Sequence, residues 1–98
     1  MKPIRNDSLA ISTTSIEICQ DMEGLPPRTD IIIRNNSPSV DDVITLSIGS
    51  IKAVAGAGII LKQGEVWMNS TDISNPCWNG KIQGVCATVN GVLAIMEK

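Results

Sequence analysis

Three cysteines, a few carboxylates and two tryptophans are the side chains of this sequence whose chemistry could carry a function. Thiolates bind metal ions, but Cys19, Cys77 and Cys86 form no C-x-x-C pair and the chain contains no histidine. The usual zinc ligand sets are therefore missing. An odd number of cysteines outside a secreted chain is typical of small buried thiols. A Cys77–Cys86 disulfide across a hairpin is the alternative, and geometry decides it.

General acid–base catalysis uses histidine, or carboxylates with a shifted pKa. Most carboxylates here lie beside turn residues, and we expect them to be solvated in loops: Asp7, Asp21, Glu23, Asp41, Asp42 and Asp72. The Asp41-Asp42 pair lacks the spacing of a calcium loop. No serine has an activating base, since the chain has no histidine and no G-x-S-x-G sequence. We predict no catalytic residue, no metal site, no cofactor and no enzyme activity.

The remaining glycine motif and the charge balance exclude other classes of ligand. Gly56-Ala57-Gly58 lacks the third glycine of a dinucleotide-binding loop and favours a bend or a close approach of strands. With a net charge of −2 and scattered basic residues, direct binding of nucleic acid is not expected.

No apolar run approaches the ~20 residues of a membrane span. Residues 1–8 are followed by no apolar signal segment, so we expect synthesis in a cytoplasm.

Trp67 and Trp78 are the only aromatic residues of the chain. A β domain either packs such residues in its core or displays them to a partner, and tryptophan is enriched at interface anchors. We expect both to be at least half buried. Trp78 ends a loop and is expected to be the more exposed, and the two are the candidate partner contacts.

The elements that must position these side chains are strand-like throughout. Val43 to Ile48 alternates apolar and other residues, as a half-buried strand does. Thr29 to Asn35 contains three consecutive isoleucines, which favours a central strand covered on both faces. Further runs predict strands in Leu9–Cys19 (two short strands, or one broken by a bulge near Thr13-Thr14), in Ile51–Leu61 (two short strands pivoting at Gly56 and Gly58) and in Glu65–Met68.

A hairpin is predicted at the C-terminal end of the chain. Lys81–Val89 and Val92–Glu97 flank Asn90-Gly91, which suits a type I′ turn. Seven or eight short strands without a convincing amphipathic helix predict one all-β domain, either a small antiparallel β-sandwich or a jelly-roll-like barrel.

A pattern of turns and strand edges carries a resemblance. It consists of Ile33-Arg34-Asn35-Asn36, Gly58-Ile59-Ile60-Leu61-Lys62-Gln63-Gly64-Glu65, Cys77-Trp78-Asn79-Gly80-Lys81-Ile82-Gln83-Gly84-Val85 and Gly91-Val92-Leu93-Ala94-Ile95-Met96-Glu97. Over roughly residues 29–97 it resembles small β-sandwich structural proteins of bacteriophages. The resemblance implies a virion protein: a capsid decoration or cement protein, or a module of a spike or head fibre. It implies no catalytic residue.

Residues 1–28 fall outside the resemblance. We expect them to form an N-terminal arm and first strand region, with residues 29–98 as the sandwich body of one domain. The expected role is a non-enzymatic, capsid-associated virion protein, homo-oligomeric, that contacts the major capsid protein or copies of itself. The alternative is a receptor-binding spike or head-fibre module for a host-surface glycan or protein. The shortage of aromatic residues counts against a sugar site.

Overall fold

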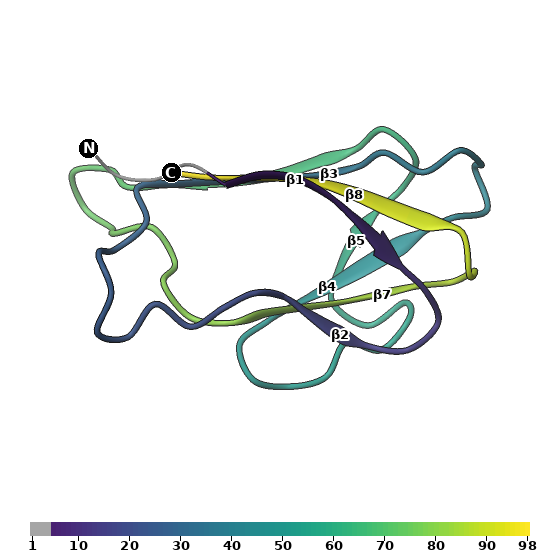
Figure 1. The fold of residues 1–98 in the computed structure, drawn as a ribbon, viewed down its shortest axis with the longest axis horizontal. Helices are drawn as coiled ribbons and strands as arrows, with labels where there is room; N and C mark the ends of the chain where they lie inside the picture. The colour runs from purple at the N-terminus through teal and green to yellow at the C-terminus, as the bar shows by residue number, and fades with distance from the viewer. Residues whose placement is uncertain (1–4) are drawn as a thin grey trace.

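The computed structural model describes residues 5–98, which form two four-stranded antiparallel sheets packed face to face (Figure 1). The strands are β1 (Arg5–Ile11), β2 (Ile16–Cys19), β3 (Asp30–Asn35), β4 (Ile44–Ile48), β5 (Ile59–Leu61), β6 (Val66–Ser70), β7 (Ile82–Cys86) and β8 (Gly91–Glu97). The first sheet has the order β1-β8-β3-β6 and the second has the order β2-β7-β4-β5. The predicted all-β sandwich is confirmed.

Alternating apolar residues on the inner faces form the core between the sheets. In β3, Ile31 and Ile33 have 0% exposure, and in β4 Ile44 and Leu46 have 0% exposure. Burying each such side chain contributes about 1.5–3 kcal/mol. A shift of one residue would turn each strand's apolar set outward, so this core fixes the register. The outer face of β3 is not covered as predicted, because Arg34 is exposed and Ile32 is only partly buried.

The N-terminal region contributes one strand to each sheet. β1 pairs with β8 in the first sheet, and β2 pairs with β7 in the second. Leu9–Cys19 therefore contains two strands rather than one bulged strand, and β1 begins earlier, at Arg5. Residues 5–19 are part of the sandwich and form no separate arm, while residues 1–4 of the expected arm lie outside the described residues.

The predicted C-terminal hairpin is wrong. β7 pairs with β2 and β4, whereas β8 pairs with β1 and β3, so the connection at residues 87–90 crosses between the sheets. Neither Asn90 nor Gly91 has the positive φ that a type I′ turn requires. Gly91 serves a close approach instead, because an added Cβ would lie 2.7 Å from Cys86 Sγ and from Ile11 O. The need to fill both sheets overrides the local turn preference.

The segment Ile51–Leu61 contains one strand, β5, instead of two. Residues 49–58 form a loop that runs below β2 and β4 in Figure 1. The backbone N–H of Gly56 donates to Thr45 Oγ1 at 3.1 Å. The glycines do serve a bend and a close approach, since a Cβ on Gly58 would lie 2.6 Å from Leu46 O.

This loop covers part of the outer face of the second sheet. The N–H of Ala53 donates to Ser15 Oγ at 2.9 Å, which holds the loop on the sheet. Ala53 is buried, and so are Thr45 and Val85, which point outward from β4 and β7. The loop therefore shields the middle of this outer face, while Ile60 of the edge strand β5 remains 44% exposed.

Candidate functional site

The buried carboxylate Asp42 is structural, and the prediction that it is solvated is wrong. It is 1% exposed, and it accepts hydrogen bonds from Thr88 Oγ1 and from the N–H of Ser39. Asn35, also buried, donates to the carbonyls of Asp42 and Leu61, each at 2.8 Å. These polar groups pair with one another and close one end of the sandwich. The other five carboxylates predicted to be solvated are exposed, although Asp7 lies in β1 rather than in a loop: Asp7, Asp21, Glu23, Asp41 and Asp72.

Arg28 closes the opposite end, and the sequence analysis missed it. It follows two prolines in a loop, yet it is only 2% exposed. Its Nη1 donates to the carbonyls of Trp78 at 3.3 Å and Gly80 at 3.2 Å, and its Nη2 donates to the carbonyl of Gln20. Its backbone N–H donates to Asn79 Oδ1 at 2.7 Å. Arg28 therefore ties the loop before β3 to the loop before β7.

Glu97 connects Arg28 to the N-terminal strand. Its carboxylate lies 3.5 Å from Arg28 Nε and 3.2 Å from Arg5 Nη1. Burial, a hydrogen bond to Glu97 and the negative charge of Glu97 together raise the pKa of the neighbouring Cys19 thiol to about 12, against the opposing charges of Arg28 and Arg5. A thiol of this kind stays protonated at neutral pH and is not a nucleophile.

The Cys77–Cys86 disulfide does not form, because all three cysteines are free and buried. Cys77 Sγ lies 3.5 Å from the carbonyl of Asn69, whereas Cys86 Sγ lies 3.7 Å from Thr88 Oγ1. The extended strand β7 separates the two cysteines in the chain, at a rise of about 3.3 Å per residue. That separation far exceeds the spacing of a disulfide.

The two tryptophans lie in different environments, as expected. Trp67, in β6, is partly buried and packs against the core, whereas Trp78 is 39% exposed. Trp78 Nε1 donates to the carbonyl of Lys81 at 3.0 Å, which fixes the indole in place. The structure does not bring the two side chains into one site.

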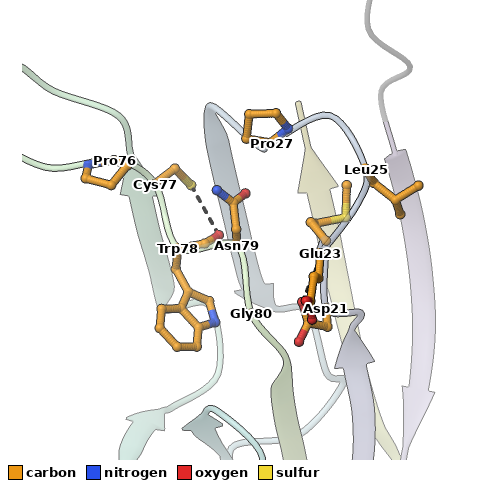
Figure 2. Close-up of a pocket in the computed structure, with 10 residues that line it drawn as sticks. Asp21, Glu23, Leu25, Pro27, Pro76, Cys77, Trp78, Asn79 and Gly80 are labelled. Atoms are coloured by element: carbon orange, nitrogen blue, oxygen red, sulfur yellow. Dashed lines mark hydrogen bonds between the residues drawn. The ribbon is translucent and has the colours of Figure 1, made fainter.

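Trp78 lines a groove of about 560 Å³ between two loops (Figure 2). Residues 21–27 form one wall and residues 76–80 the other. The lining combines apolar side chains with two carboxylates: Met22, Leu25, Pro27, Pro76 and Trp78, with Asp21 and Glu23. Arg28 hydrogen-bonds to Trp78, Asn79 and Gly80 of one wall and to Gln20, next to the other wall, so the groove belongs to the folded sandwich.

A second candidate surface is the outer face of the first sheet, which we call the open face. It consists of Asn6, Ser8 and Ala10 of β1, Val92, Ala94 and Met96 of β8, Asp30, Ile32 and Arg34 of β3, and Val66, Met68 and Ser70 of β6. None of these residues is buried, and Met68 is 63% exposed and Val66 45% exposed. The first sheet thus presents two neighbouring exposed apolar side chains of β6, whereas the second sheet presents Ile60 of β5, which is 44% exposed.

Residues 5–98 contain no group of three or more histidine, cysteine, aspartate or glutamate side chains placed to hold a metal ion. The same residues contain no helix long and apolar enough to cross a membrane. Comparisons with protein-family models, with curated proteins and with solved structures found no match. The resemblance to phage structural proteins stays a prediction.

Replacing Arg28 with methionine tests its role in closing the sandwich. The variant Arg28→Met leaves the carbonyls of Gln20, Trp78 and Gly80 without their donor, and Glu97 with one cation fewer. We expect the free energy of unfolding to fall by about 3 kcal/mol. Urea denaturation in dilute solution measures it, with Arg34→Met on the exposed face as the matched control, expected within about 0.5 kcal/mol of wild type. Equal losses in the two variants would contradict this role.

The raised pKa of Cys19 predicts a dependence of stability on alkaline pH. Between pH ~9 and pH ~12 the unfolded chain loses the thiol proton while the folded chain keeps it. The free energy of unfolding should therefore fall with rising pH by up to about 1.4 kcal/mol per unit. Urea denaturation from pH 9 upward should show a steeper fall for wild type than for Cys19→Ala, in which all other groups titrate alike. Parallel profiles would refute the burial of a neutral thiol.

Proposed function

We propose that this chain is a non-enzymatic structural protein of a virion, a capsid decoration, cement or minor capsid component that acts through protein–protein contacts. The sequence pattern of residues 29–97 supports the virion setting. The observation that carries the mode of action is the open face, where the apolar side chains of Val66 and Met68 lie on the same side of β6 and remain exposed.

The open face has the physical properties of a protein-binding surface. Contiguous exposed apolar patches on soluble proteins mark interaction sites, and here Met68, Val66 and Ile32 adjoin one another on β6 and β3. The side chains project from hydrogen-bonded strands, so binding orders little backbone and loses little entropy. Methionine adapts its shape to a facing surface. A net charge of −2 with scattered basic residues favours a protein partner over nucleic acid.

The groove beside Trp78 favours a second candidate function, a receptor-binding module of a spike or head fibre. Its exposed indole and its two carboxylates would suit a host-surface glycan or protein with polar and apolar parts. The groove lies at the end of the sandwich, away from the centre of the open face, so the two surfaces are separable by mutation.

One experiment on assembled particles tests the proposed function. The tagged chain is produced together with its virion partners, and the particles are separated from soluble protein on a density gradient. We expect wild type to migrate with the particles. A buried lysine opposes an apolar contact, so Met68→Lys should reduce particle-bound chain at least tenfold, while Trp78→Ala remains bound. Circular dichroism of each purified variant controls for folding.

Two results would contradict the proposal. Wild-type chain that stays in the soluble fractions excludes a virion component. Normal incorporation of Met68→Lys excludes the open face as the attachment surface. Particles that incorporate Trp78→Ala but lose attachment to host cells would establish the receptor-binding alternative.

A further inference from the structure

Strand β6 is an edge of the first sheet, because among the described strands it pairs with β3 alone. A hydrogen bond at each end of this ladder fixes which backbone groups meet. The N–H of Thr71 donates to the carbonyl of Thr29 at 2.8 Å, and the N–H of Asn35 donates to the carbonyl of Glu65 at 3.0 Å. Hydrogen-bonded and non-hydrogen-bonded pairs alternate along an antiparallel ladder. The odd-numbered residues of β6 therefore turn their N–H and C=O groups toward β3.

The even-numbered residues of β6 turn the same groups away from the sheet. These residues are Val66, Met68 and Ser70, and their N–H and C=O groups face no neighbouring strand within residues 5–98. No residue of β6 is buried, so solvent reaches this edge. A row of donors and acceptors that repeats every two residues of extended chain is complementary to another extended backbone. The chemistry of the edge therefore specifies a β-strand as its partner.

The sequence of β6 lacks the features that keep an edge strand from pairing with another chain. Charged side chains, proline, bulges or a very short strand give that protection. β6 has five residues, none of them charged or proline, and its register with β3 is unbroken. The other three edges are protected: β1 carries Arg5 and Asp7, β2 carries Glu17 and a register shift, and β5 has three residues. Among these edges, β6 is the one open to pairing.

The strand is complementary to itself in one register. When two copies pair antiparallel about a two-fold axis at Met68, Met68 lies opposite Met68, and Val66 lies opposite Ser70 on both sides of the axis. Every outward-facing N–H and C=O of β6 then has a partner, whereas a shift by two residues would leave one residue of each copy unpaired. Paired residues project to the same side of a sheet. The Met68 side chains, 63% exposed in the single chain, therefore cover each other.

We propose that β6 pairs antiparallel with β6 of a second copy of this chain, about a two-fold axis at Met68. The pairing joins the four-stranded first sheets of the two copies into one continuous sheet. No like charges meet, since β6 carries none. Pairing with β1 of a second copy would instead place the polar Asn6 and Ser8 beside the apolar side chains of β6, and it would not close into a dimer.

The inference goes beyond the proposed function, because the contact is made by the backbone at the edge of the sheet. The open faces of the two copies then lie side by side on one face of the joined sheet. They would offer a capsid partner a surface twice as wide as that of the single chain.

The length of the edge sets the strength of the dimer. Five residues of strand extend over about 17 Å, and a sheet with its side chains is about 10 Å thick. Such a contact is much smaller than the about 800 Å² per partner of a standard interface. We therefore expect a weak dimer that dissociates on dilution and becomes populated where copies are held close together on a particle.

A proline at the two-fold axis tests the backbone pairing. Met68→Pro removes an N–H that points away from β3, so the ladder within the chain stays intact. Both central hydrogen bonds of the dimer are lost, and dimerisation should weaken at least tenfold. Met68→Leu keeps the N–H and an apolar side chain, and as the matched control it should dimerise within about twofold of wild type.

Charges at the same position test the register. Met68→Lys and Met68→Glu each place two like charges opposite one another, and each should weaken dimerisation at least tenfold. An equimolar mixture of these two variants should form a heterodimer, because lysine then lies opposite glutamate. Sedimentation equilibrium at low salt, over a wide concentration range, measures every sample, and circular dichroism shows that each variant is folded.

Amide hydrogen exchange followed by NMR locates the contact. In dilute protein the N–H groups of Val66, Met68 and Ser70 should exchange fast, and those of Trp67 and Asn69, which face β3, should exchange slowly. Raising the protein concentration should slow exchange at the first three and leave the other two unchanged.

Four results would overturn the inference. They are a wild type that is monomeric at every concentration up to its solubility limit, a folded Met68→Pro that dimerises like wild type, a charge mixture that stays monomeric, and a dimer in which the outward N–H groups of β6 still exchange fast. Failure of the proposed function looks different. A monomeric chain that still migrates with particles refutes only the strand pairing, and a dimer that never joins particles refutes only the virion role.

Discussion

The packing of two inner sheet faces against each other is the constraint on which the rest of this structure depends. Two four-stranded sheets have four faces, and the core covers the two inner ones with isoleucine, leucine and cysteine side chains. The loop of residues 49–58 lies on part of the outer face of the second sheet. The fourth face is the open face. Its exposed apolar side chains make it a candidate surface for binding another protein.

Polar side chains complete the two ends of the sandwich, which the strands leave open. At one end Arg28 and Glu97 satisfy loop carbonyls and each other's charge. At the other end Asn35 and Asp42 link the turn after β3 to the connection between β7 and β8. Such groups are costly to bury unless they are paired. The paired groups hold in place the loops that form the groove beside Trp78 and the ends of the strands that form the open face.

Most of the fold could be predicted from local sequence patterns. The exceptions depend on which strands become neighbours in the tertiary fold. Alternation in residues 43–48 and the apolar run at residues 31–33 identify β4 and β3, because period-2 burial is a local property. Asn90-Gly91 indicates a hairpin only if the flanking strands pair, and here they belong to different sheets.

The buried polar groups were harder to predict than the strands. No residue near Arg28 in the sequence signals its burial, because its carbonyl partners at positions 20, 78 and 80 are assembled by the tertiary fold. Asp42 is likewise buried through Thr88, which lies 46 residues further along the chain. The open face was not anticipated, since it depends on which strands are neighbours and which outer face the loop covers.

The methyl resonances of the methionines test the central claim, that this chain contacts protein through the open face. Met68 and Met96 lie on the open face, whereas Met22 lines the groove at the end of the sandwich. With methyl-labelled methionine, NMR spectra are recorded as virion particles are added to the protein. The account predicts progressive broadening of the Met68 and Met96 methyl signals and an unchanged Met22 signal. Changes confined to Met22, or none at any particle concentration, would contradict it.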